Sequence, residues 1–434
     1  MRRHFSLLMI LGLFIMPAHG QGLIGIYELA AQNDPQLKVV RAQMESVRES
    51  KPQAMARLRP TVSASTGADR IKRDVRSSST GARDSSYSSS DFVLSLSQPI
   101  YRRDYWIQLE QSDRQIAQAE AEYASAEQEL MIRVSQAYFD VLSAEDTLEF
   151  AQAELTAIGR QLDQAKQRFE VGLIAITAVH EAQAAFDQSR ADEIRADNEV
   201  GNAWEALHEI IGHTEAALTP LSSDLPLNPP DPMDINQWSD TALEQNLSLI
   251  ALRNATEFAK QKIDLEYAGH YPTIELVGSH SLNSSSASSS TDSETSSIGF
   301  QLNMPLYSGG SVTSSTRQAR FDYEAAQENL DKQRRAVNRQ ARDAYRGVVS
   351  SISGVKALEA STISAKSALE ATEAGFEVGT RTMVDVLDEQ RDLYRVRRDY
   401  SSVRYGYIMS GLRLKFAAGV ISRTDLEAVN GWLE

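Results

Sequence analysis

Apolar side chains recur at every seventh position over long stretches of the chain, and small residues lie three positions after many of them. One run covers residues 134–169, with Ala137 as the first of its small positions, and a second covers 386–414. A heptad pattern of this kind predicts long helices that pack closely as coiled coils. We expect two long helical hairpins, over residues 102–212 and 309–417.

Other segments alternate apolar and polar residues with a period of two, which is typical of strands. Phe92, Leu94 and Leu96 share one face of the first clear example, and Phe300 belongs to a second. Strands are expected at about 61–70, 88–99, 273–282 and 296–305, with long flexible Ser-rich loops over 71–88 and 283–296. Strands with one apolar face, short turns at one end and long polar loops at the other favour an outer-membrane barrel.

Prolines mark the places where the expected helices meet the expected strands. Proline ends a helix and pushes the residue before it into an extended conformation. These helix–strand joints are Pro60, Pro99, Pro272 and Pro305. Tyrosines and a tryptophan cluster near them, as in the aromatic girdle of a membrane barrel.

The chain repeats itself at an offset of 207 residues. Phe-Glu-Val-Gly occupies 169–172 and again 376–379, and the proline-rich stretch between the two halves reads as a linker. The expected organisation is a signal peptide (1–20), a first repeat (21–212), a linker and equatorial region (213–235), a second repeat (236–419) and a C-terminal equatorial segment (420–434).

The first twenty residues combine Arg2 and Arg3 with a short apolar run and small residues at Ala18 and Gly20. This arrangement predicts a signal peptide and therefore an exported protein. A net charge of −15 argues against a nucleic-acid partner, because phosphate binding requires a basic surface.

No catalytic motif stands out, so we expect neither an enzyme nor a cofactor. The chain has no cysteine, which excludes disulfides and thiolate metal sites. His208 and His213 are five residues apart and would not share a helix face. We therefore expect no metal site.

One chain offers four strands, whereas closed bacterial barrels have at least about eight. Open sheet edges are not tolerated in lipid, so the chain is expected to oligomerise. Two copies give a barrel filled by side chains, and three give twelve strands around a lumen. The competing hypothesis is an exported coiled-coil scaffold or adhesin without channel activity, which would lack amphipathic strands.

Three motifs carry a resemblance to a known family: QNDPQL near residue 32, RQLDQAKQRFEVGLIAIT at 160–177 and EAGFEVGTRTMVDVLD at 373–388. Together with the proline-bounded strands, they resemble the TolC outer-membrane efflux channel family over nearly the whole chain. The resemblance implies a mostly α-helical homotrimer with a shared 12-stranded outer-membrane β-barrel in lipid, a periplasmic α-helical tunnel and an equatorial collar. It implies a duct for drug efflux and type I protein secretion that docks a periplasmic adaptor (a membrane fusion protein) and an inner-membrane transporter.

The same resemblance implies roles for residues at the two hairpin turns. Expected adaptor-docking residues are Val171, Gly172, Leu173, Val378, Gly379 and Thr380. Expected gate and selectivity residues are Asp385 and Asp388, and the expected gate links are Arg381, Thr177, Gln161, Glu373 and Phe376.

In the family the arginine is bonded to a threonine and an aspartate of the first repeat, and the glutamine is linked to a glutamate of the next protomer. This chain has Ala178 where the aspartate is expected and Phe376 where a tyrosine is common. These two departures imply a resting gate that is held less tightly than in the family.

Overall fold

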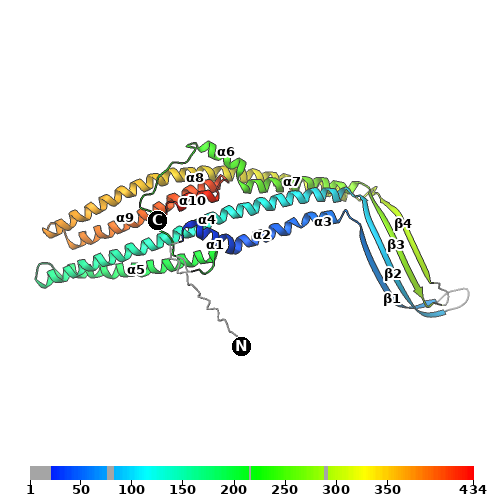
Figure 1. Cartoon of the computed structure of the whole chain (residues 1–434), viewed down its shortest axis with the longest axis horizontal. Helices are drawn as coiled ribbons and strands as arrows, with labels where there is room; N and C mark the ends of the chain where they lie inside the picture. Colours follow the sequence, from blue (N-terminus) through cyan, green and yellow to red (C-terminus); the bar gives the residue numbers. More distant parts are fainter. Residues whose placement is uncertain (1–20, 76–82, 215–216, 288–291) are drawn as a thin grey trace, which may run out of the picture. The chain divides into compact units, whose positions relative to one another are not determined.

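The computed structural model describes residues 21–75, 83–214, 217–287 and 292–434 (Figure 1). The signal peptide expected over 1–20 and the middle of each Ser-rich segment therefore lie outside the described residues. The chain forms two compact units. The first contains residues 1–38, 126–244 and 338–434, and the second contains 39–125 and 245–337.

The helices account for most of the described chain. They are α1 (Leu23–Asn33), α2 (Pro35–Arg48), α3 (Ser50–Ala56), α4 (Arg103–Glu170), α5 (Ile176–Ile211), α6 (Ile235–Gln245), α7 (Leu247–Tyr267), the 3-10 turn η1 (Ala268–His270), α8 (Ser311–Glu377), α9 (Met383–Ala417) and α10 (Arg423–Asn430). The long pairs α4 with α5 and α8 with α9 are the hairpins that the heptads predict. Among the described helices, none is both long enough and apolar enough to cross a membrane.

The second unit contains one antiparallel sheet in the order β1-β2-β3-β4 (Figure 1). Its strands are β1 (Thr61–Val75), β2 (Arg83–Tyr101), β3 (Thr273–Ser285) and β4 (Ser293–Asn303). They run further into the Ser-rich segments than expected, since residues 71–75 and 83–88 are strand and not loop. The reason is that the ladder is made by the backbone, so charged residues and serines extend it as well as apolar residues do.

The register of the sheet brings most of the apolar residues of the four strands to one face. Leu96 lies opposite Val62 on one side and Gly278 on the other, and Gly278 in turn lies opposite Ile298. Along β4 this face continues with Phe300, which is 76 % exposed in the single chain. Serines and other polar residues occupy the opposite face, because successive side chains of a strand point to opposite sides. The sheet therefore has an uncovered apolar face and two open edges, β1 and β4.

Three of the four prolines stand between a helix and a strand. Pro60 and Pro272 directly precede β1 and β3, and Pro305 follows β4. Pro99 differs from the expectation, because β2 continues past it to Tyr101 with a shift of register between the two residues. A proline cannot donate to the ladder, and a local irregularity of this kind accommodates it.

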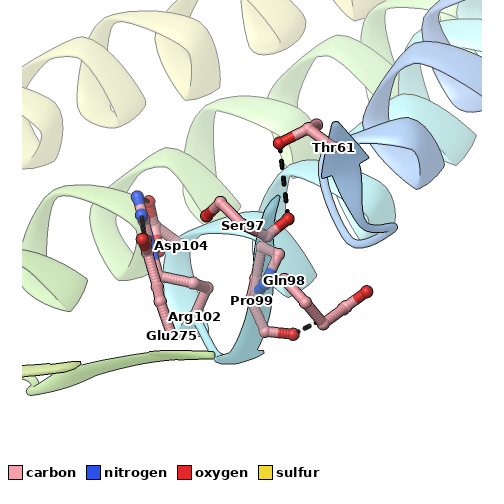
Figure 2. A network of polar contacts seen from close by, with 7 residues as sticks. All are labelled: Thr61, Ser97, Gln98, Pro99, Arg102, Asp104 and Glu275. Atoms are coloured by element: carbon pink, nitrogen blue, oxygen red, sulfur yellow. Dashed lines mark hydrogen bonds and ion pairs between the residues drawn. The ribbon is translucent and has the colours of Figure 1, made fainter. Parts of the chain in front are cut away.

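Polar contacts fasten the end of β2 to its neighbours (Figure 2). The Arg102 guanidinium contacts Asp104 at 2.9 Å and Glu275 of β3 at 2.8 Å. The Gln98 amide donates to the carbonyl oxygens of Leu58 and Pro99, at 2.9 and 2.8 Å. These bonds fix the point at which strand gives way to helix.

In the first unit, Asp34 of the QNDPQL motif joins α1 to α2. Its carboxylate accepts a hydrogen bond from the Leu37 N–H at 2.7 Å and pairs with Arg133 of α4 at 2.7 Å. Asp34 is almost fully buried, so both partners are needed to offset its desolvation. The motif therefore anchors the N-terminal helices to the first long hairpin.

Candidate functional site

Both long hairpins turn through the same backbone motif. The Gly172 N–H donates to the Phe169 oxygen at 2.8 Å, and the Leu173 N–H donates to the Arg168 oxygen at 2.8 Å. The same pair of bonds recurs in the second repeat, from Gly379 to Phe376 at 3.2 Å and from Thr380 to Gly375 at 2.8 Å. This is the Schellman motif, which needs a left-handed residue after the helix. Gly172 and Gly379 supply it with φ of 76° and 79°.

The two turns, defined here as the tips (residues 171–175 and 378–382), expose apolar side chains. Val171, Leu173 and Val378 are 70, 72 and 74 % exposed. A Cβ added at either glycine would meet nothing within 4 Å. The tips are thus open surfaces, as a docking site requires, and the expected docking residues lie on them.

An apolar cluster joins the two hairpins just behind the tips. Met383 and Leu387 of α9 are buried against residues of α4 and α5, namely Ile158, Leu162, Ala165, Ala182 and Ala185. Burying a Met or Leu side chain contributes about 1.5–3 kcal/mol. Ala178 packs against this cluster, so an apolar contact takes the place of the aspartate that the resemblance leads one to expect.

Of the expected gate links, the structure brings Gln161 and Glu373 together. The amide nitrogen lies 3.5 Å from the carboxylate, which is at the long limit for a hydrogen bond. The two side chains therefore lie close to each other within one chain, and the expected link between protomers stays a prediction. At this length the bond is weak, and the apolar cluster contributes more to holding the hairpins together.

Phe376 lies just before the second tip, in the last turn of α8, and Arg381 belongs to the tip. The Arg168 guanidinium lies over the Phe376 ring, 4.8 Å from its centroid. Phe376 has no hydroxyl group, but its ring still attracts this cation. Arg381 packs its aliphatic stem next to Gly375. Within the described residues, the Arg381 guanidinium makes no hydrogen bond or ion pair with Thr177.

Asp385 caps α9. Its carboxylate accepts hydrogen bonds from the Thr382 N–H at 2.8 Å and the Thr382 hydroxyl at 2.9 Å, and the Asp385 N–H donates back to that hydroxyl at 3.3 Å. This capping box is absent from the first tip, where Ala175 provides no side-chain cap for α5. The bonds from Thr382 lower the pKa of Asp385, and the nearby Arg381 lowers it further. Asp385 therefore stays charged at neutral and mildly acidic pH.

Asp388 lies one turn further along α9 and is exposed. It pairs with Arg391 at 3.2 Å, an exposed contact three residues apart on one helix. Such pairs contribute little to stability, so this carboxylate is available to other ions. Asp385 and Asp388 together place two carboxylates at the start of α9, where the corresponding positions of the first repeat are Ala178 and Glu181.

The structure also brings His208 and His213 together, although their spacing in the sequence predicts that they do not share a helix face. Glu205, His208 and His213 each offer a ligand atom, and these atoms all lie within 4.8 Å of one another. The expectation that the two histidines lie apart is wrong, because α5 ends at Ile211 and Gly212, with φ of 80°, turns the chain back. A glycine directly before the second histidine is the sequence signal that could have revealed this.

The chain matches the family model described as "Outer membrane efflux protein" over residues 26–213 and 238–420. It is 40% identical to the outer membrane protein TolC of Vibrio cholerae serotype O1, covering 98% of both chains. It is 32% identical to TolC of Escherichia coli K12, over 96% of this chain and 86% of the relative. It is 31% identical to the alkaline protease secretion protein AprF of Pseudomonas aeruginosa, over 95% and 87%.

Solved structures share the fold at low sequence identity. The CmeC outer membrane channel of Campylobacter jejuni superposes with a TM-score of 0.79 at 16% identity, covering 96% of this chain and 90% of that chain. The outer membrane protein VceC of Vibrio cholerae gives a TM-score of 0.77 at 19% identity, over 92% and 96%.

Proposed function

This chain belongs to the outer membrane efflux protein family, and from that premise we propose that three copies form one duct, gated at the hairpin tips. The protein is an outer-membrane channel of the efflux and secretion class that extends into the periplasm. Its fold is mostly helical with four antiparallel strands. The observation that carries the proposal is the continuous apolar face that the register aligns across all four strands.

The trimer follows from the open edges of the sheet. In lipid, every backbone N–H and C=O must be paired, so the edges at β1 and β4 require partners. Joining β4 of one copy to β1 of the next supplies them, and three copies give twelve strands around a lumen. The apolar face then contacts lipid and the Ser-rich face lines the lumen. The coiled-coil scaffold or adhesin does not account for such a sheet.

We place adaptor docking at the tips. Val171, Leu173 and Val378 present apolar surface there, next to the left-handed glycines and Thr380. Exposed apolar side chains on a rigid turn suit the tip of a partner's helical hairpin. An inner-membrane transporter would then engage the channel through this adaptor, for drug efflux or protein secretion.

We place the gate at α9, where Asp385 and Asp388 would form two rings of three carboxylates each in a trimer. The cluster around Met383 and Leu387, with Gln161 and Glu373, would hold the closed state. Arg381 would contact Thr177 only in another state of the gate, because the described residues show no bond between them. Rings of acidic side chains select cations and bind multivalent ions strongly.

Asp385→Asn with Asp388→Asn should abolish block of the channel by multivalent cations added from the periplasmic side, because both rings lose their charge. Single-channel recording in planar bilayers measures this. Asparagine keeps a side-chain oxygen for the cap that Thr382 completes, so the tip keeps its fold. In Asp388→Asn, where Asp385 alone supplies the charge, the remaining block should be equal at pH 7 and pH 5, because the pKa of Asp385 is lowered.

The matched control is Asp192→Asn, a half-buried carboxylate of α5 paired with the exposed Arg195. It should leave the block unchanged. Undiminished block in the double variant would show that the acidic rings lie elsewhere.

Ala178→Asp should lower the resting conductance. A carboxylate at this position would give Arg381 the ionic partner that the family resemblance places in the first repeat, and a charge-assisted bond contributes about 1.5–3 kcal/mol. Ala178→Asn is the control, since it disturbs the same apolar cluster without adding charge. Equal conductance of the wild type and Ala178→Asp, or an equal decrease with Asn, would contradict a gate loosened by the missing ion pair.

A further inference from the structure

The C-terminal end of α5 carries a cluster of metal-ligating side chains far along the chain from the tips. A carboxylate oxygen of Glu205 and a ring nitrogen each of His208 and His213 lie within 4.8 Å of one another. The two imidazole rings are 5.2 Å apart, centroid to centroid, and are tilted by 54°. Glu205 and His213 are exposed and His208 is half-buried, so the cluster opens to solvent on one side.

Two features of the surroundings favour a cation at this cluster. The His208 Nδ1 is buried and, among the described residues, has no hydrogen-bond partner, so no protein group competes for this nitrogen. The cluster also lies at the end of α5, where the helix dipole is negative. Together with the Glu205 carboxylate, the dipole compensates the positive charge of a bound ion.

We propose that Glu205, His208 and His213 form a binding site for Zn²⁺ or a similar divalent transition metal. Imidazole nitrogens and one carboxylate oxygen are ligands that zinc accepts, with water in the fourth position. Tetrahedral bonds of about 2.0–2.1 Å separate ligand atoms by about 3.4 Å. Metal binding at this cluster requires the ligand atoms to approach one another by about 1 Å, and two of the three side chains, Glu205 and His213, are exposed.

The position of the site indicates what bound metal would do. His213 is the first residue of the segment that links the two repeats, whereas Glu205 and His208 belong to α5. A shared ion would therefore fasten the start of this segment to the end of the helix. The inference is independent of the tips and of the gate.

Isothermal titration of the full-length protein, purified in detergent without a histidine tag, tests the site with Zn²⁺ alone. We expect one Zn²⁺ per chain and at least a tenfold loss of affinity in His208→Gln and in His213→Gln. His180→Gln is the matched control, because His180 is an exposed histidine of the same helix outside the cluster. Mg²⁺ should not bind, because it prefers oxygen ligands.

Absence of Zn²⁺ binding to the wild type would overturn the proposal, as would unchanged binding in His213→Gln. His213 is exposed and lies beyond the helix, so its replacement leaves the fold intact. An equal loss of affinity in His180→Gln would show that zinc binds to surface histidines without a defined site.

Trp204 provides an optical test of the same site. Its ring lies 5.7 Å from that of His208, and its indole N–H donates to Glu145 at 3.2 Å. Ni²⁺ bound at the cluster should quench the fluorescence of Trp204, and Trp204→Phe should remove the Ni²⁺-dependent quenching while Zn²⁺ still binds. Quenching of equal size in Trp204→Phe would place the metal elsewhere.

Discussion

Phe300→Arg should deplete the protein from the outer membrane. Phe300 lies on the apolar face of β4 and is 76 % exposed in the single chain, so in the proposed barrel it contacts lipid. An arginine on the lipid face of a barrel costs about 2–4 kcal/mol near the bilayer centre, and a trimer carries the change three times. The amount of heat-modifiable oligomer in outer-membrane fractions measures the effect, and we expect most of it to disappear.

Gln301→Arg is the matched control for this variant. Gln301 is the next residue of the same strand, is also exposed and points to the opposite, polar face. It should assemble normally, because a charge on the lumen side remains in water. If the two variants assemble equally well, or if only Gln301→Arg fails, the assignment of the lipid face is wrong.

Gly379→Val and Gly172→Val should stop efflux and secretion while the channel remains abundant in the membrane. Both glycines have a left-handed backbone, which costs an L-residue about 1–2 kcal/mol, and a Cβ meets no other atom there. The fold therefore tolerates valine at a small cost, whereas the shape of the tip changes. Drug susceptibility and the amount of secreted protein report the loss of function.

Gly212→Val separates docking from backbone strain, because Gly212 has φ of 80° and similarly open surroundings at the end of α5. It should retain efflux. Leu173→Asp provides a second test, since this exposed side chain can change without strain. Loss of the assembled channel in the two tip-glycine variants would make these glycines structural only, and normal efflux in Leu173→Asp would argue against docking on the first tip.

The sequence predicts the long helices and the existence of four strands, because heptads and alternation report directly which face of an element is apolar. It predicts the strand ends less well. Residues 71–75 and 83–88 are mostly polar and show no apolar alternation, yet the backbone ladder includes them. Pro99 was expected to end a strand that continues to Tyr101, because a register shift accommodates a residue without an N–H group.

Contacts between side chains are harder to predict than elements. The 3.5 Å approach of Gln161 to Glu373 within one chain could not be predicted from the sequence, because it depends on the packing of the hairpin helices against each other. His208 and His213 were expected to lie on different faces of one helix. The helix α5 ends at Ile211, before His213, so helical spacing does not apply to this pair. Sequence periodicity predicts which face of a helix or strand a residue occupies. It does not predict where a side chain lies beyond a left-handed turn, because the period ends there.

The capping box of α9 gives Asp385 a part in starting this helix, in addition to the part in permeation that we propose for it. Any substitution that tunes ion selectivity at this position also alters how firmly the first turn of α9 is held by Thr382. Asp388 does not cap the helix, because its partner is the exposed side chain of Arg391. In a lineage adapting to new cargo, we therefore expect Asp388 to vary first, with Asp385 changing only to residues that still cap the helix.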